Sequence, residues 1–236
     1  MLETGYNSRF EIRMEQLPSA VSSPIRVLYL SDFHFNKRSG DMAVKLGQAI
    51  MRLTPDIVLF GGDYIDALAG LAHLDALLQH IKGTCPMLAI AGNHDRFFGM
   101  KVVRETMQKH DVQWIEGRSV ELVVKDVGIR IDGNMAVAGD FNPAIRILCL
   151  HKPVDLKKLP VSYHLAFAGH LHGSQCVLWQ NEHGLFPGRI FYKWNRLKAQ
   201  VGDCRYYISR GMGDTLPIRY NCPKELLVVD LETNKR

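Results

Sequence analysis

Short apolar runs alternate with amphipathic stretches along the first half of the chain. Runs rich in β-branched residues predict buried strands, and apolar positions three or four residues apart predict helices with one buried face. The predicted strands are 25–30, 57–60 and 86–91, and the predicted helices are 42–53, 71–81 and 100–110. Because strands that alternate with helices are typical of parallel sheets with helical crossovers, we expect a parallel sheet here.

After residue 112 the pattern changes to short alternating runs without long amphipathic stretches. The predicted strands are 119–124, 127–131, 134–139 and 145–150, followed by 164–168, 203–209 and 225–231. Turn signals at Gly128 and Gly133 favour antiparallel pairing of these strands in a second sheet. No linker or internal repeat divides the chain, so we expect a single domain over residues 1–236. Its predicted fold class is α/β, with two face-to-face mixed β-sheets flanked by helices.

The composition is that of a soluble globular protein, since 47% of the 236 residues are apolar and 22% are charged. These values exclude collagen-like and disordered chains. No run approaches the roughly 18 apolar residues of a membrane span, and the charged first 30 residues contain no apolar signal-peptide core. The five cysteines lack a C-x-x-C pair, which favours reduced thiols in a cytoplasmic protein. A disulfide between Cys204 and Cys222 is the alternative that the sequence leaves open.

Residue types that bind metals follow five of the predicted strands. The segments are Asp32-Phe33-His34, residues 62–66, residues 92–95, His151 and residues 169–173. In α/β sheets, ligands lie beyond the carboxyl ends of the strands, so these side chains are expected to meet in one place. Carboxylate, amide and imidazole donors together suit divalent Mn, Fe or Zn.

The order D-x-H, G-D-x-x-D, G-N-H-D, H and G-H-x-H resembles the calcineurin-like metallophosphoesterases over residues 25–231. A narrower resemblance is to single-domain bacterial enzymes of that family with the motif G-H-x-H-G-G-Q. This chain carries that motif over residues 169–175, with Ser174 in place of the second glycine. Those relatives include enzymes that cleave the pyrophosphate of UDP-2,3-diacylglucosamine. The resemblance implies a pair of β-sheets flanked by helices, in agreement with the pattern above.

The resemblance also implies two divalent metal ions, Mn, Fe or Zn with Mn slightly favoured, and it assigns their ligands. Seven side chains form this set: Asp32, His34 and His172 for one ion, Asn93, His151 and His170 for the other, and Asp63 bridging both. By the same resemblance, His94 would face the phosphate and protonate the leaving oxygen, and Asp66 would orient His94.

These residue types suit phosphoester hydrolysis. Two cations about 3.5–4 Å apart hold the attacking and leaving oxygens of an in-line displacement, and metal-bound water that loses its proton near pH 7 can attack phosphorus as hydroxide. An imidazole with its ordinary pKa of about 6.5 is suited to protonating the departing alkoxide. The expected function is therefore hydrolysis of a small or lipid-linked phosphodiester or pyrophosphate.

Substrate choice is expected to depend on the segment after the last metal motif. Residues 176–200 interleave aromatic with basic side chains, which fits a lid or a membrane-facing insertion; an ordinary hairpin or helix packed on the core is the alternative. Arg96, Arg210 and Arg219 are further candidates for gripping phosphate, because a planar guanidinium suits that task. A structural or solvated position is the alternative for each of the three. His110 is interpreted as a surface or helix-capping residue.

The net charge of +5 is confined to one end of the chain. Residues 1–188 carry 19 basic and 19 acidic side chains, whereas residues 189–236 carry 10 basic and 5 acidic ones. We therefore expect a basic rim beside the active site, which favours an anionic substrate or an anionic membrane surface as partner over nucleic acid. The expected localisation is cytoplasmic, with peripheral attachment to the inner face of the membrane as the further hypothesis.

Two alternatives remain from other functional classes. A nuclease acting on DNA or RNA fits the basic C-terminal region, but the modest overall charge argues against it. A metal-free scaffold with the same fold requires missing ligands, and every ligand position is filled here. The sequence leaves the oligomeric state open.

Overall fold

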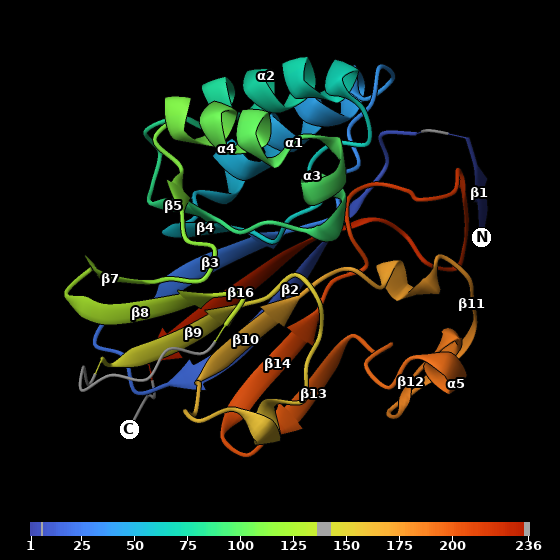
Figure 1. Ribbon diagram of the computed structural model, residues 1–236. Coiled ribbons are helices and arrows are strands. Elements are labelled where there is room, and N and C mark those ends of the chain that lie inside the picture. The colour runs from blue at the N-terminus through green and yellow to red at the C-terminus, as the bar shows by residue number, and fades with distance from the viewer. Residues whose placement is uncertain (6, 136–142, 234–236) are drawn as a thin grey trace.

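Two six-stranded β-sheets pack face to face, and helices cover the outer face of the first sheet (Figure 1). The computed structural model describes residues 1–5, 7–135 and 143–233. The α-helices are α1 (Gly40–Leu53), α2 (Leu71–Ile81), α3 (Asn93–Phe98), α4 (Met100–Lys109) and α5 (Gly188–Phe191). Single 3-10 turns are η1 (Leu68–Gly70), η2 (Leu156–Lys158) and η3 (His172–Ser174). The predicted α/β class with two mixed sheets flanked by helices is confirmed.

The first sheet contains the parallel strands that the sequence predicts. Its strands, in spatial order, are β2 (Glu11–Ser19), β16 (Glu225–Thr233), β3 (Ile25–Leu30), β4 (Ile57–Phe60), β5 (Met87–Ala89) and β6 (Gln113–Trp114). Strands β3, β4 and β5 run parallel. Val58 and Phe60 pack beneath the helices, whereas Ile57 and Leu59 face the second sheet. Both faces are buried, which is why these strands are uninterrupted apolar runs.

The second sheet is mixed, and the predicted antiparallel pairing is wrong for its centre. Its strands, in spatial order, are β13 (Lys198–Val201), β14 (Cys204–Ile208), β10 (Leu165–Ala168), β9 (Ile145–Cys149), β8 (Val127–Gly133) and β7 (Ser119–Val124). The pairs β7–β8 and β13–β14 are antiparallel, whereas β8, β9, β10 and β14 run parallel. Parallel neighbours require crossover connections instead of the hairpin turns that the glycine signals suggest, which explains the difference.

One predicted strand of this region lies mostly outside the described residues. The predicted strand 134–139 falls largely on residues 136–142, which lie outside the described residues, and residues 134 and 135 belong to no strand. Two strands near the N-terminus escape the pattern. Strand β2 lies at the sheet edge in parallel register with β16, and β1 (Leu2–Thr4) pairs with β15 (Ile218–Tyr220). An edge strand with one solvent face carries mostly polar residues, and this weakens its apolar signal.

Residues 176–200 form a hairpin, a short helix and an edge strand. The hairpin strands are β11 (Val177–Asn181) and β12 (Gly184–Pro187); α5 follows, and β13 then joins the second sheet. In Figure 1 the hairpin and α5 lie beside β13, away from the helical layer. Across the described ranges, no helix is long and apolar enough to cross a membrane. All five cysteines are free, so the Cys204–Cys222 bridge is not formed.

Candidate metal centre

The loops at the carboxyl ends of five strands converge on one site. Strands β3, β4 and β5 of the first sheet and β9 and β10 of the second sheet supply these loops. Within the described chain, three groups of side chains each bring their ligand atoms within 4.8 Å of one another. Two of them consist of predicted metal ligands: Asp32, His34 and His172 form the first group, and Asp63, His151 and His170 form the second. The remaining group joins His34 to Asp66 and His94. The sequence-predicted ligands are thus brought together from segments more than a hundred residues apart.

In the first group, the Nε2 atom of His172 lies 3.1 Å from Nε2 of His34 and 3.6 Å from Oδ1 of Asp32. All three side chains are almost completely buried. The lone pairs of two imidazole nitrogens at this distance repel each other unless a proton or a cation lies between them. This arrangement is typical of ligands that share a metal ion.

In the second group, the Nε2 atom of His151 is the central donor. It lies 3.3 Å from Oδ2 of Asp63, 2.9 Å from Oδ1 of Asn93 and 3.2 Å from Nδ1 of His170. The Nδ1 atom of His151 lies 2.8 Å from the Gly61 carbonyl oxygen and donates to it, which fixes the ring with Nε2 directed into the site. The residues of this group therefore present mixed oxygen and nitrogen donors.

Asp63 connects the two groups. Its Oδ2 atom lies 3.3 Å from Nε2 of His151 in one group and 3.9 Å from Nε2 of His34 in the other. Ligand atoms bound to one divalent cation at about 2.0–2.2 Å lie about 3–3.6 Å apart, a spacing that the two groups reproduce. The residues present therefore fit divalent cations by donor type and by spacing.

The backbone at these ligands adopts a conformation that L-residues rarely take. Asp32, His34, Asp63, His170 and His172 all have φ between 47° and 70°. A residue other than glycine in this region costs about 1–2 kcal/mol, and such residues cluster at functional sites. Close approach adds a further constraint, because a Cβ atom at Gly92 would collide with Oδ1 of Asp63. The chain therefore accepts local strain to direct these side chains inward.

The electrostatics of the site favour positive charge. Burial opposes the charged form of His151, but its hydrogen bond to Asp63 and the charges of Asp32 and Asp63 outweigh burial and raise its pKa to about 9. The pKa of His34 is also raised, because Asp66, Asp32 and Asp63 together outweigh its burial. Buried carboxylates need a positive partner, and divalent cations would supply one here.

His94 and Asp66 lie beside the first group. The Nδ1 atom of His94 is 2.9 Å from Oδ1 of Asp66, and Nδ1 of His34 is 2.6 Å from the same oxygen. Both His94 and Asp66 keep about a quarter of their side chains exposed, whereas the three ligands of the first group are buried. Burial opposes ionisation of Asp66, but the two histidines outweigh it and lower the pKa of Asp66. The partly exposed imidazole can therefore reach a molecule bound at the metal groups.

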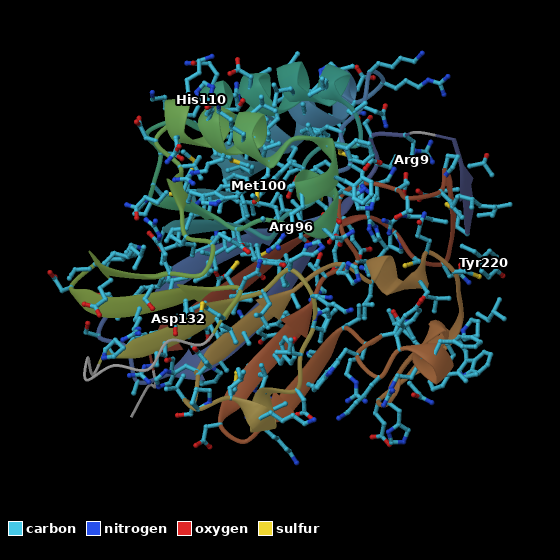
Figure 2. The ribbon with its side chains drawn as sticks, in the orientation of Figure 1. Arg9, Arg96, Met100, His110, Asp132 and Tyr220 are labelled. Atoms are coloured by element: carbon cyan, nitrogen blue, oxygen red, sulfur yellow. The ribbon has the colours of Figure 1, made fainter. Side chains whose placement is uncertain are left out.

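The three predicted phosphate-gripping arginines occupy different environments. Arg96, on α3 at the edge of the site (Figure 2), is largely exposed and pairs with Glu116 at 2.8 Å. Arg210 is buried against Glu225 and also pairs with Glu11. Arg219 is buried against Asp214 at 2.5 Å. Of the three, only Arg96 presents its guanidinium to solvent beside the site.

Sequence reasoning missed the part played by Asp95. This carboxylate is completely buried and accepts hydrogen bonds of 2.8 Å from the backbone N–H groups of Asp63, Tyr64 and Gly92. Burial raises its pKa to about 6, although these hydrogen bonds oppose the shift. Asp95 thereby ties the loop of the bridging Asp63 to the start of α3. The signal available was its place as third residue of that helix, where an acidic side chain can accept from the backbone N–H group of the N-cap residue.

His110 was expected at the surface or at a helix cap, and the structure places it at a helix cap but not at the surface. It caps the end of α4 as expected (Figure 2), but its side chain is buried and its Nε2 atom contacts Oδ1 of Asp75 on α2 at 2.8 Å. The pairing joins two helices of the outer layer. It could not be read from the helix periodicity alone, because the partner lies 35 residues away.

A family model described as calcineurin-like phosphoesterase matches residues 25–200. The chain belongs to this family. It is 24% identical over 229 residues to Phosphodiesterase YaeI of Escherichia coli (strain K12), covering 89% of this chain and 83% of that protein. It is also 24% identical over 243 residues to an uncharacterized metallophosphoesterase of Aquifex aeolicus (strain VF5), covering 95% and 90%.

The fold has counterparts among solved structures. A 5'-nucleotidase precursor from Thermus thermophilus aligns with a TM-score of 0.52 at 13% identity, over 89% of this chain and 55% of that one. A sulfate thiohydrolase SoxB from the same organism aligns with a TM-score of 0.50 at 12% identity, over 96% and 58%. At such identities these likenesses concern the fold. Family membership makes the chain a phosphoester hydrolase, and its histidines and aspartates form a candidate cluster of metal ligands.

Proposed function

We propose that the chain hydrolyses a small or lipid-linked phosphodiester or pyrophosphate with two divalent cations. The observation that carries the proposal is Asp63, whose Oδ2 atom faces His151 of one ligand group and His34 of the other. Asp32, His34 and His172 would hold one cation, and Asn93, His151 and His170 the other, with Asp63 between them. When bound, such cations neutralise the phosphoryl oxygens and acidify the attacking water.

His94 would donate a proton to the leaving oxygen. Asp66 occupies its Nδ1 atom at 2.9 Å, so Nε2 is the nitrogen that would meet the substrate. Because Asp66 accepts a hydrogen bond from the ring, it fixes the orientation of His94. Arg96 would contact an anionic group of the substrate from the rim, since its guanidinium is largely exposed.

The lipid-linked substrate class is supported by the surface of residues 176–200. Trp179, Ile190 and Phe191 are at least half exposed there, and the Trp179 ring stacks on Phe186 at 5.1 Å. Exposed aromatic and apolar side chains gathered on one segment, here over β11 and α5, are typical of a surface that meets a bilayer or a lipid. This segment would act as a lid or as a membrane-facing insertion on an anionic surface. UDP-2,3-diacylglucosamine is the specific substrate that the family resemblance suggests.

The basic excess contributes less to this surface than the sequence suggests. Lys193 pairs with Asp155 at 3.2 Å, and Lys198 pairs with Glu15 at 2.8 Å. These acidic partners come from the charge-balanced first 188 residues, so part of the excess is neutralised in the folded protein. Because these lysines are already paired with carboxylates, the exposed apolar side chains are the stronger argument for a lipid partner.

The decisive experiment is a screen of metals against substrates with purified protein. Mn²⁺, Fe²⁺ and Zn²⁺ would each be tested with UDP-diacylglucosamine, nucleotide diphosphates, simple phosphodiesters, phosphomonoesters and DNA. We expect Mn²⁺-dependent hydrolysis of a diester or pyrophosphate, lost in Asn93→Ala and His172→Ala but kept in the matched control His73→Ala on α2. Preferred cleavage of DNA would favour a nuclease. Absence of metal binding and of hydrolysis would favour the metal-free scaffold.

A further inference from the structure

The loop around Gly213 lies against two of the predicted metal ligands. The Gly213 N–H group donates to the carbonyl oxygen of Asp32 at 2.6 Å. Two residues earlier, a Cβ atom at Gly211 would lie 3.3 Å from Nδ1 of His172, so the same loop also lies directly against the His172 ring.

The loop that contains Gly213 lies against the end of β3. Met212 N–H donates to the Ser31 carbonyl oxygen at 3.0 Å. Gly211 has φ +74°, and a Cβ atom there would lie 2.8 Å from Cβ of Asp32. This left-handed conformation and the short approach both require glycine. Small shifts of the loop would therefore move Asp32 and His172 directly.

Arg219 holds this loop in place. Its Nη2 atom donates to the carbonyl oxygens of Gly213 at 2.5 Å and Arg210 at 3.0 Å. Its Nη1 atom donates to the Cys222 carbonyl oxygen at 3.1 Å, and its Nε atom donates to Oδ1 of Asp214 at 2.5 Å. The side chain is 2% exposed. The guanidinium therefore joins four separate acceptors behind the metal ligands.

Two further contacts, one at Asp214 and one at His172, surround the Arg219 guanidinium. Lys224 binds the other carboxylate oxygen of Asp214 at 2.8 Å, so Asp214 is fixed from both sides. The Nη2 atom of Arg219, which binds the Gly213 carbonyl, also lies 3.4 Å from Nδ1 of His172. No lysine could make these contacts together, because a single ammonium lacks the planar fork of arginine.

We propose that Arg219 is a positioning residue of the metal centre. By binding the Gly213 carbonyl, Arg219 fixes the loop whose N–H group holds Asp32. Its Nη2 atom also lies against Nδ1 of His172, the ring whose Nε2 atom faces Asp32 and His34. This inference rests on the proposed function in one respect, namely that these three side chains bind a metal ion. It assigns Arg219 to the protein side of the site, in contrast to a role in gripping phosphate.

The test is calorimetric titration of metal-free protein with Mn²⁺ in the absence of substrate. Arg219→Lys is expected to weaken binding of one of the two ions about tenfold and to leave the other unchanged, as changes behind metal ligands typically do. Asp214→Asn keeps Arg219 but removes its carboxylate partner, and it should weaken the same ion. The matched control is Arg26→Lys, which loses a bidentate contact with Asp230 at the opposite end of β3. This variant should bind both ions normally.

Other results would overturn the proposal. If folded Arg219→Lys and Asp214→Asn bind Mn²⁺ as the wild type does, Arg219 does not position the centre; a raised KM with unchanged Mn²⁺ affinity would instead identify a phosphate contact. Equal weakening in Arg26→Lys would indicate general destabilisation and also overturn it. A wild-type protein that binds no Mn²⁺ would overturn the proposed function, whereas normal wild-type binding beside unchanged variants overturns this inference alone.

Discussion

One carboxylate oxygen of Asp66 lies 2.6 Å from Nδ1 of His34, a predicted metal ligand. The same oxygen lies 2.9 Å from Nδ1 of His94, the predicted proton donor. The two imidazole rings meet edge to face with centroids 4.6 Å apart. Asp66 therefore links the residue that would bind a metal ion to the residue that would act on the leaving group.

This double contact predicts two effects of Asp66→Asn. The neutral amide orients the imidazoles less strongly, so we expect kcat to fall about 10²-fold and the affinity for one metal ion to fall about tenfold. Steady-state kinetics and Mn²⁺ titration would measure the two effects, with Asp155→Asn at an exposed ion pair as control. Unchanged metal affinity beside a lower kcat would show that Asp66 serves His94 alone.

The proposed proton transfer predicts a dependence on the leaving group in His94→Ala. Poor leaving groups such as simple alkoxides need a proton, so their hydrolysis should slow by about 10²–10³-fold. A p-nitrophenolate leaving group needs little protonation and should lose less than about tenfold. The measurement is kcat/KM for a series of diesters with leaving groups of graded pKa. Equal losses along the series would assign His94 to charge stabilisation instead.

The contact between Asp75 and buried His110 predicts a pH-dependent loss of stability in Asp75→Asn. Hydrogen bonds from Lys109 and His110 lower the pKa of Asp75 below its ordinary value. The stabilising effect of ionised Asp75 is therefore complete above its pKa in the unfolded chain, about 3.9. It is lost as the pH falls through the lower pKa that Asp75 has in the folded protein. We expect a loss of about 1 kcal/mol at pH 7 in urea unfolding, discounted for the partial exposure of Asp75.

The control for this prediction is Asp111→Asn. Asp111 pairs with Lys82 at 3.1 Å, but it is highly exposed, so its removal should change the free energy of unfolding by only a few tenths of a kcal/mol. The difference between the two variants should shrink toward zero below about pH 3. A difference that persists at low pH would show that Asp75 acts by packing and not by its charge.

The exposed apolar side chains of α5 predict binding to anionic vesicles. Replacing Ile190 and Phe191 together with serine removes apolar area that would be buried in the bilayer, and we expect about tenfold weaker binding. Co-sedimentation with phosphatidylglycerol vesicles would measure it, and a blue shift of Trp179 fluorescence would report insertion. Val123→Ser, at an exposed apolar position on β7, is the control. Equal effects of both changes would argue against a specific surface.

Much of the metal centre is predictable because its residues directly follow buried strands. The runs before Asp32, Asp63 and Asn93 are apolar on both faces, so the ends of the strands are clear in the sequence. The partners of Arg210 and Arg219 are not predictable in this way. Glu225 lies 15 residues from Arg210 and Asp214 lies five residues from Arg219, and neither separation is a regular helix or strand spacing that would predict the contact.

The order of strands in the second sheet is hidden for a related reason. Alternating apolar residues identify β7 to β10 as strands but do not distinguish a turn from a crossover. Asp95 illustrates a different limit. Its motif is visible in the sequence, but its backbone partners at Asp63 and Tyr64 depend on how two loops approach one another.

The position of β16 has a consequence for how the protein is made. This strand, which ends at Thr233, lies between β2 and β3, with Leu227 opposite both Arg13 and Tyr29. Every side chain of the metal centre is synthesised before residues 225–233. The first sheet nevertheless stays divided until those residues insert, so β2 has no neighbour in that sheet until then. Competence to bind metal should therefore arise abruptly once β16 is free to insert, and not gradually as each ligand emerges from the ribosome.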